Sequence, residues 1–192
     1  MTIDNLDKVY FTSDTHFYHK NIIRYCNRPF ESIEEMNRSL IENWNNKVPK
    51  DAIVFHLGDF AFCNESQIKE LVSQLNGRTI LIKGNHDAKN DKFLNSVFSE
   101  VYPQLYLVAN KQPIYLNHFP LLCYPSHAWN FFGHVHSKPG SIGTDTSKLK
   151  YCASTQYDVG VDLNNYTPIS FEEAKEKIQT QITNNANITM WL

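Results

Sequence analysis

The sequence lacks the features that mark secreted, membrane-spanning and disulfide-stabilised proteins. It has only four cysteines in 192 residues, and no two of them form a C-x-x-C pair, which favours reduced thiols over a disulfide framework or a zinc knuckle. Residues 1–10 have neither the basic nor the apolar region of an export signal, and no apolar run reaches the length of a membrane span. We therefore expect a cytoplasmic protein with no membrane partner.

A large excess of charge of one sign is also missing. The chain has 18 basic and 20 acidic side chains and a formal net charge of -2, so no global basic field attracts nucleic acid, and any affinity for polyanions must be local. The hydrophobic share of 42% is typical of globular proteins. We expect one domain over residues 1–192, because the loops, such as residues 137–151, are too short for a separate cap domain.

Strand and helix patterns alternate along the first half of the chain, and strands dominate from residue 105 to residue 161. Helices are predicted at residues 32–44, at residues 65–76 and from Ser170 onward, each with a capping residue before an apolar stripe. The sequence therefore predicts a mixed α/β sheet architecture. Runs of β-branched and aromatic residues predict strands at residues 8–12, 53–57, 79–82, 114–117 and 129–132.

Side chains that bind metals follow each of these five predicted strands. A lone D-x-H is more often a turn aspartate beside an incidental histidine, and a single histidine is often a core or surface residue. Functional sites of open α/β sheets lie at the carboxyl ends of the strands, however, and a coincidence at five strand ends is improbable. We therefore interpret the set as one site. Its residues are Asp14 and His16, Asp59, Asn85, His118, and His134 and His136.

The types of these side chains indicate the metals. Imidazole, carboxylate and amide oxygen without thiolate suit Mn²⁺, Fe, Zn²⁺, Ni²⁺ or Co²⁺, and they argue against a purely structural zinc site, which favours cysteine. Seven such residues are too many for one catalytic ion with an open position. They suit two divalent ions, with Mn²⁺ preferred, about 3.5–4 Å apart and sharing a bridging carboxylate.

The order D-x-H, G-D, G-N-H-D, a lone histidine and G-H-x-H resembles the motif series of the calcineurin-like metallophosphoesterase superfamily. The resemblance implies a four-layer α/β/β/α sandwich of two mixed β-sheets flanked by helices, with a dinuclear metal site at the carboxyl ends of strands. Longer strings resemble the small, uncapped bacterial and phage members. These strings are FTSDTHFYHKNII, NWNNKV, HLGDF and YDVGVDLNNYTPIS.

The resemblance also implies a role for each site residue. His86 would face the substrate phosphate and the leaving group rather than bind metal, and Asp59 would bridge the two ions. The remaining residues would be divided between the ions, with Asp14, His16 and His136 on one and Asn85, His118 and His134 on the other.

One motif departs from the series. Protein phosphatases of this superfamily continue as G-D-x-x-D-R-G, whereas Phe60, Ala61 and Phe62 follow Asp59 here. The acid that would orient the catalytic imidazole and the arginine that would grip phosphate are both missing, which disfavours protein phosphatase activity. Asp87 or an acid within residues 158–162 is a candidate for holding His86 instead.

Three further residues have a weaker assignment. His19 and Arg24 follow the first metal motif, where a cationic loop could meet the substrate phosphate, although an ordinary surface loop fits the same pattern. His56 lies inside a predicted strand, and we interpret it as structural.

The expected activity is metal-dependent hydrolysis of phosphate esters. Diesters derived from nucleotides or nucleic acid are slightly favoured as substrates, by analogy with the fold. The alternatives are a phosphomonoesterase of the same fold, a non-catalytic metal-binding scaffold, and a mononuclear structural zinc protein. The intact ligand set and the presence of His86 argue against the scaffold.

Overall fold

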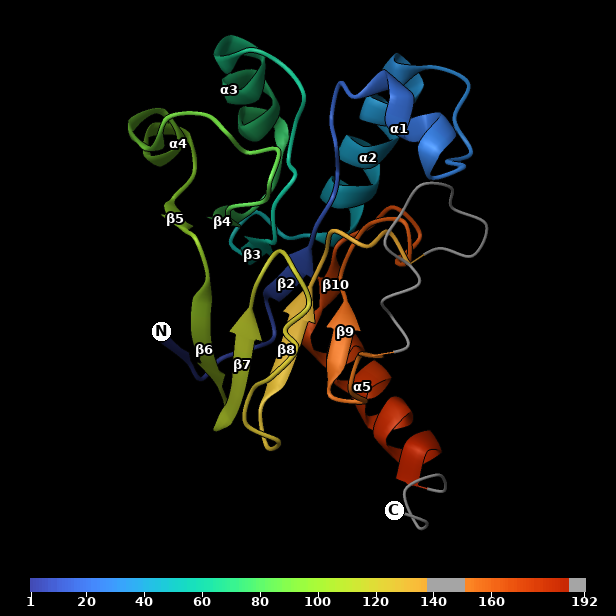
Figure 1. The fold of residues 1–192 in the computed structure, drawn as a ribbon. Coiled ribbons are helices and arrows are strands. Elements are labelled where there is room, and N and C mark those ends of the chain that lie inside the picture. Colours follow the sequence, from blue (N-terminus) through green and yellow to red (C-terminus); the bar gives the residue numbers. More distant parts are fainter. Residues whose placement is uncertain (138–150, 187–192) are drawn as a thin grey trace.

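The computed structural model describes residues 1–137 and 151–186, and two five-stranded sheets form its centre (Figure 1). The β6–β7 and β10–β2 pairs are antiparallel and the other pairs are parallel, so both sheets are mixed. The first sheet has the order β1 (Thr2–Ile3), β6 (Leu105–Ala109), β7 (Gln112–Leu116), β8 (Trp129–Phe132) and β9 (Gln156–Asp158). The second has the order β10 (Ile169–Ser170), β2 (Val9–Thr12), β3 (Ile53–His56), β4 (Arg78–Ile82) and β5 (Glu100–Tyr102).

One hydrophobic core fills the space between the two sheets. Phe11 of β2 stacks on Phe55 of β3 with ring centroids 5.5 Å apart, and it meets Phe131 of β8 edge-on at 4.9 Å. All three rings are fully buried. Aromatic pairs of this geometry add to the stabilisation from burial, and they fix the two sheets against each other.

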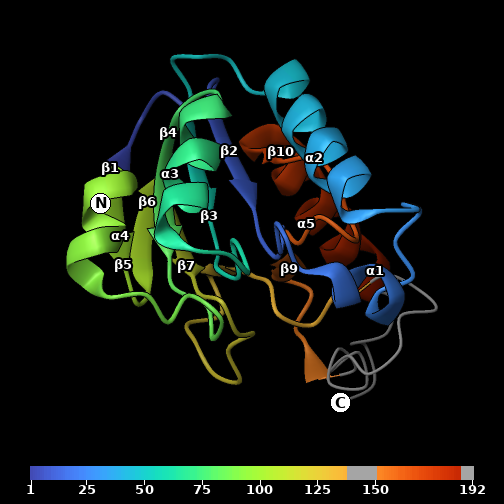
Figure 2. The same ribbon diagram turned by 90° about the horizontal axis from the view of Figure 1, so that it is seen from above.

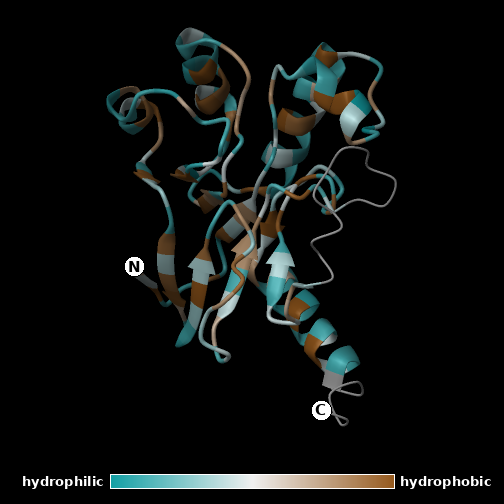
Figure 3. Ribbon diagram, viewed as in Figure 1, coloured by the Kyte–Doolittle hydropathy of each residue, from teal (hydrophilic) through white to brown (hydrophobic). Residues whose placement is uncertain are grey.

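Four helices pack on the other face of the second sheet: α1 (Lys20–Tyr25), α2 (Ile33–Lys47), α3 (Glu65–Gln74) and α4 (Asp91–Val97). In Figure 2, α1 and α2 lie on one side of this face and α3 and α4 on the other. Ser32 caps α2 by accepting a hydrogen bond from the backbone of Glu35. Hydrophobic and hydrophilic residues alternate along the helices (Figure 3), as expected for amphipathic helices on a sheet.

The last helix, α5 (Phe171–Ala186), closes one side of the sandwich. It contacts β2, β9 and β10, and Phe171, Ala174 and Ile178 join the core between the sheets. On β6 and β7, buried and less buried residues alternate, and Tyr106 is 47% exposed. The two mixed sheets flanked by helices are thus confirmed. The expected fourth layer, a helix layer on the outer face of the first sheet, is not confirmed. No helix in the described ranges covers the face on which Tyr106 is exposed.

The five predicted strands correspond to β2, β3, β4, β7 and β8, and the three predicted helices to α2, α3 and α5. No individual prediction covers α1, α4, β1, β5, β6, β9 and β10, although β6 and β9 lie in the part of the chain that was expected to be rich in strands. Of the loop expected at residues 137–151, residues 138–150 lie outside the described part. Within the described residues, no helix combines the length and the apolar character that crossing a membrane requires.

Candidate metal centre

The carboxyl ends of parallel strands from both sheets meet at one place in the molecule. The arrowheads of β7, β8 and β9 point to the same side in Figure 1. Backbone hydrogen bonds join the loops beyond the strands, with the N–H of Asp14 donating to the carbonyl of Gly58 at 3.0 Å and that of Gly133 to the carbonyl of His118 at 2.9 Å. The described residues contain three groups of ligand-type side chains whose atoms lie within 4.8 Å of one another, and one of them, Cys26, His136 and Asp162, lies behind His136. The other two groups consist of residues predicted from the sequence. They are Asp14, His16 and His136, and Asp59, His118 and His134.

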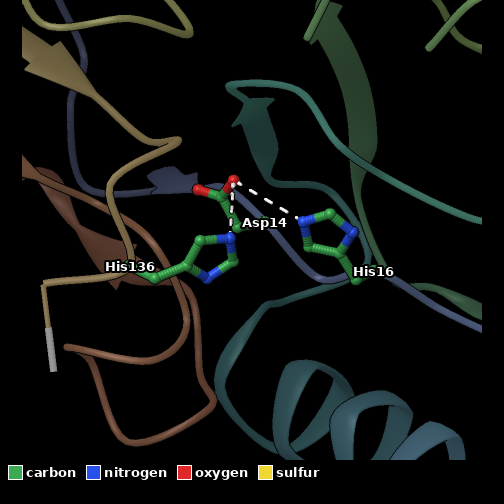
Figure 4. A group of neighbouring side chains, drawn as sticks. All are labelled: Asp14, His16 and His136. Carbon is green, nitrogen blue, oxygen red and sulfur yellow. Dashed lines mark ion pairs between the residues drawn. The ribbon is translucent and has the colours of Figure 1, made fainter. Parts of the chain in front are cut away.

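The first group surrounds one carboxylate oxygen (Figure 4). Asp14 Oδ1 lies 3.9 Å from His16 Nε2 and 3.8 Å from His136 Nε2. The other oxygen, Asp14 Oδ2, accepts hydrogen bonds from the Ser13 hydroxyl and from the backbone N–H of His134. Asp14 Oδ1 and His16 Nε2 are buried and have no hydrogen-bond partner among the described residues. Buried polar atoms are rarely left unpaired, so a cation between them fits this group.

Asp59 belongs to the group of His118 and His134, and it also lies close to the group of Asp14. Its Oδ2 is 3.5 Å from His16 Nε2 and 3.5 Å from His118 Nε2, while its Oδ1 accepts the backbone N–H of His86 at 2.9 Å. Asn85 joins the second group, because its Oδ1 is 2.9 Å from His118 Nε2. All seven residues predicted as ligands are therefore brought together, and the position of Asp59 suits a bridging carboxylate.

Three of the histidines have a partner for the ring nitrogen that faces away from these groups. His118 Nδ1 is 2.7 Å from the carbonyl of Leu57, His136 Nδ1 is 2.7 Å from Asp162, and His16 Nδ1 is 3.3 Å from His19 Nδ1. A carbonyl or a carboxylate can only accept, so Nδ1 of His118 and of His136 donates the proton. Each Nε2 then faces a ligand-type group and can offer its lone pair to a cation once it carries no proton, which is how metal-binding histidines are usually held.

Burial and the neighbouring charges shift the pKa values of three residues of the centre. Burial lowers the pKa of His16 well below its ordinary value and raises the pKa of Asp59 to about 6. Burial also lowers the pKa of His136, but the carboxylates of Asp14 and Asp162 outweigh it and raise the pKa to about 11. A cation beside Asp14 would neutralise that carboxylate and replace the proton on His136 Nε2.

The backbone of the centre is in an uncommon conformation. Five of the seven ligand-type residues have positive φ: Asp14 (55°), His16 (49°), Asp59 (56°), His134 (69°) and His136 (47°). This region is sparsely populated by residues other than glycine and is often found at functional sites. Gly133 allows the close approach of two of these loops, because a Cβ there would lie 1.8 Å from Ser13 Oγ.

His86 borders a cavity of about 430 Å³ that His16, Asp59, His134 and His136 also line. Its side chain is 42% exposed, and its Nε2 lies 3.9 Å from Asp59 Oδ2. It is thus beside the ligand-type groups while its ring remains open to the cavity, as the resemblance implies for a residue that meets the substrate.

The acids proposed to hold the His86 ring have other partners, which corrects that expectation. Asp87 accepts the backbone N–H groups of Asp59, Phe60 and Gly84, at 2.8–3.1 Å. Asp158 accepts from Ser137 and Gly160, and Asp162 from His136 and Arg28. The ring of His86 instead contacts Phe62, with centroids 4.8 Å apart. Phe62 stands where protein phosphatases of the family carry the orienting aspartate.

The two residues suggested for a cationic loop are separated in the structure. His19 lines the cavity and stacks on Phe62, and burial lowers its pKa, which favours a neutral ring. Arg24 is exposed, and its guanidinium lies 5.3 Å from the Tyr25 ring centroid, outside the wall of the cavity. His56 is fully buried beside Thr15 and burial lowers its pKa to about 4, in agreement with a structural role.

Arg28 was not among the residues predicted from the sequence. Its buried guanidinium pairs with Asp162 at 2.8 Å and donates to the carbonyls of Asp14 and Thr15 at 2.7 and 2.9 Å. Through Asp162 it supports His136, and through the carbonyls it holds the loop that carries Asp14 and His16. No local pattern marks such a residue, because its partner Asp162 is 134 positions away.

Two mixed sheets with clustered imidazole and carboxylate groups at their strand ends define a hydrolase-type metal centre. The family model described as calcineurin-like phosphoesterase matches residues 7–146, and the chain belongs to this family. Its members are hydrolases of phosphoester bonds, and the chain has the His and Asp groups needed to bind divalent metals.

The chain is similar to three other proteins whose names state no function. It is 35% identical to an uncharacterized protein of Methanocaldococcus jannaschii over 170 residues, 88% of this chain and 89% of that protein. It is 36% identical to the gene 66 protein of Mycobacterium phage L5 over 85 residues, 43% of this chain and 41% of that protein. A crystal structure of a protein of unknown function from Aquifex aeolicus covers 88% of this chain and 97% of its own, with 27% identity and a TM-score of 0.68.

Proposed function

We propose that this chain hydrolyses phosphate esters at a dinuclear centre, with phosphodiesters favoured over phosphomonoesters. The observation that carries the proposal is Asp59 Oδ2, which lies 3.5 Å from one histidine of each ligand-type group. Asp14, His16 and His136 would hold one ion, and Asn85, His118 and His134 the other. Two bound ions would supply a water of lowered pKa and polarise the phosphoryl oxygens. Mn²⁺ is our first choice for both, and Fe, Zn²⁺, Ni²⁺ and Co²⁺ suit the same donors.

His86 is proposed as the catalytic group that helps the leaving oxygen to depart. Its ring is exposed to the cavity, and its backbone N–H is fixed on Asp59 Oδ1 at 2.9 Å. It can therefore hydrogen-bond to or protonate a departing oxygen without leaving its place beside the centre. The missing arginine and aspartate after Asp59 speak against phosphoprotein substrates, and the exposed side chains of His86 and Phe62 leave room for a second esterified group.

A panel of substrates tests this function. We expect the purified chain with Mn²⁺ to hydrolyse simple phosphodiesters at least as fast as phosphomonoesters, and cyclic nucleotides should be included with both classes. A strong preference for monoesters would replace the diester proposal. If cations bind but no ester is hydrolysed with any of the five metals, the chain is a metal-binding scaffold.

The four free cysteines accord with the cytoplasmic location that we propose.

Metal content tests the dinuclear part of the proposal. Elemental analysis should give two ions per chain, and Asp59→Asn should lower the content of both because its carboxylate faces both groups. His136→Ala should mainly remove one ion. At most one tightly bound ion in excess Mn²⁺, or no effect of Asp59→Asn, would contradict the bridging role.

A further inference from the structure

An aromatic wall, formed by His19, Phe62 and Tyr25, borders the cavity of the metal centre, and none of its residues is among the predicted metal ligands. Phe62 is 45% exposed and Tyr25 is 42% exposed, although both are large apolar residues. Both line the cavity together with His86. Exposed apolar surface often marks a binding site, and ligand pockets typically combine apolar walls with a few polar groups.

The wall presents its rings in an ordered stack. Phe62 and His19 are nearly parallel, with centroids 4.2 Å apart and 17° between the planes. Tyr25 meets His19 edge-on, with centroids 6.3 Å apart. His86 is tilted against Phe62 at 4.8 Å, so the ring of Phe62 directly adjoins the group proposed to meet the leaving oxygen.

The backbone of Phe62 is fixed before any ligand arrives. Its N–H donates to the carbonyl of Phe17 at 2.7 Å, and Phe17 forms a parallel bridge with Ala61. Phe17 is fully buried. A ring held on such a segment loses little conformational freedom when a ligand stacks on it, which favours binding.

Phe62 and His86 also separate two cavities. The larger one contains the metal centre, and the smaller one, of about 190 Å³, is lined by Ala61, Phe62, Cys63, His86, Ala88 and Lys89. A substrate group that extends from the centre past His86 therefore crosses the Phe62 ring. It then reaches a cavity with a cationic side chain, Lys89.

We propose that Phe62 is a specificity-determining residue that stacks on a planar heteroaromatic group of the substrate, such as the base of a nucleotide. A flat group with apolar faces and polar edges matches an aromatic ring that has His86 beside it and Lys89 in the adjoining cavity. Base–aromatic stacking of this kind contributes substantially to affinity and tolerates different bases. The proposal rests on the proposed function only in placing the phosphoryl group at the metal centre.

Equilibrium binding tests the stacking separately from turnover. The probes are phosphonate analogues of adenosine 5′-phosphate and ribose 5-phosphate, in which a P–C bond replaces the ester so that neither is hydrolysed. We expect the metal-loaded protein to bind the adenosine analogue about tenfold or more tightly than the ribose analogue in calorimetry. Phe62→Leu should abolish this preference without changing the affinity for the ribose analogue, and Phe62→Trp should retain it.

A matched control is Phe119→Leu. Phe119 is 49% exposed and contacts the ring of His134 at 4.5 Å, but it does not line this cavity, so the preference for adenine should persist. The proposal is overturned if Phe62→Leu keeps the preference, if it weakens both analogues equally, or if a cyclohexyl phosphonate binds as tightly as the adenosine analogue. Hydrolysis of simple diesters, measured in parallel, decides the proposed function independently of this result.

Discussion

The histidines of the centre differ in what holds them, and this difference separates their roles. His118 and His136 donate from Nδ1 to a carbonyl and a carboxylate, and both rings are buried. His86 is held by its backbone, and its ring contacts Phe62. A buried ring with a fixed tautomer suits metal binding, whereas an exposed ring beside the same centre can act on the substrate.

We expect His86→Ala to keep the fold and both ions but to lose activity in a way that depends on the leaving group. Help in expelling a basic alkoxide is typically worth about 10²–10⁴-fold, whereas an acidic phenol leaves without it. Rates on alkyl or nucleoside esters should fall by that factor, and rates on a nitrophenyl ester much less. Steady-state kinetics on both ester types and elemental analysis check this.

Two results would assign His86 another role. Loss of an ion in the variant would make it a ligand. An equal rate loss on both ester types would show that it acts on the attack or on binding rather than on the departing oxygen.

The sequence was enough to identify the residues that meet at the metal centre, but not the residues that support them. Asp14, Asp59 and His118 each follow a strand directly, so periodicity and position are enough to find them. Arg28 and Asp162 follow no such pattern, because the support they give depends on tertiary contacts between distant segments. The partners of Asp87 were also missed, since hydrogen bonds to backbone N–H groups leave no trace in residue spacing.

Among the elements, the loop after α1 and the loop after β9 are joined by the Arg28–Asp162 pair. Both side chains are almost completely buried, with 0% and 1% exposure. The pair connects the loop that carries Asp14 and His16 to the one that supports His136. Since removing one partner leaves an uncompensated buried charge, this pair couples the stability of the fold to the geometry of one ligand-type group.

Arg28→Met should therefore lower the free energy of unfolding by about 3 kcal/mol, the lower end of the range for breaking a buried pair. It should also weaken one of the two metal sites by about 10–100-fold, as loss of support behind a ligand typically does. Urea unfolding with a chelator present measures the first effect, and calorimetric metal titration measures the second.

Arg24→Met is the matched control, because Arg24 is exposed and lies on α1, four residues before Arg28. Its stability should stay within about 0.5 kcal/mol of the wild type. If the two variants unfold alike, or if Arg28→Met leaves both metal affinities unchanged, the coupling is absent.

The elements that could be predicted are those with strong local patterns. The helix α2 has a capping serine and the buried residues Met36, Leu40 and Trp44 on one face, and β2 is buried throughout. In contrast, β1, β5, β9 and β10 have only two or three residues each. Such short strands form because a neighbouring strand pairs with them, and this depends on tertiary structure. The position of α5 at the side of the sandwich likewise depends on tertiary contacts, with β2, β9 and β10.

For the molecule as a whole, two hydrophobic clusters form the interior and the centre lies beyond the strand ends. One cluster lies between the sheets and the other between the second sheet and helices α1 to α4. Each cluster consists of apolar side chains that pack on one another. We therefore expect the core to form without bound metal, unlike that of a structural zinc protein.

Removing metal with a chelator should abolish activity while the chain stays folded at 25 °C. Each ion present at about 100 times its Kd adds about 2.7 kcal/mol of stability, so loss of two ions should lower the melting temperature by roughly 10–20 °C for a domain of this size. Circular dichroism melts with and without chelator, together with activity after Mn²⁺ is restored, check the prediction. Loss of secondary structure at 25 °C would instead indicate a structural metal.

The positive φ angles at Asp14, His16, Asp59, His134 and His136 bear on how this chain would respond to selection. Each such residue is less stable there than glycine would be, by about 1 kcal/mol or more. When no cation is bound, repulsion between the carboxylates of Asp14 and Asp59 destabilises the folded state further. Stability and activity therefore oppose each other at the same positions. Laboratory evolution for heat resistance alone, in metal-free medium, should collect glycine or asparagine at these positions, and the more stable descendants should be inactive.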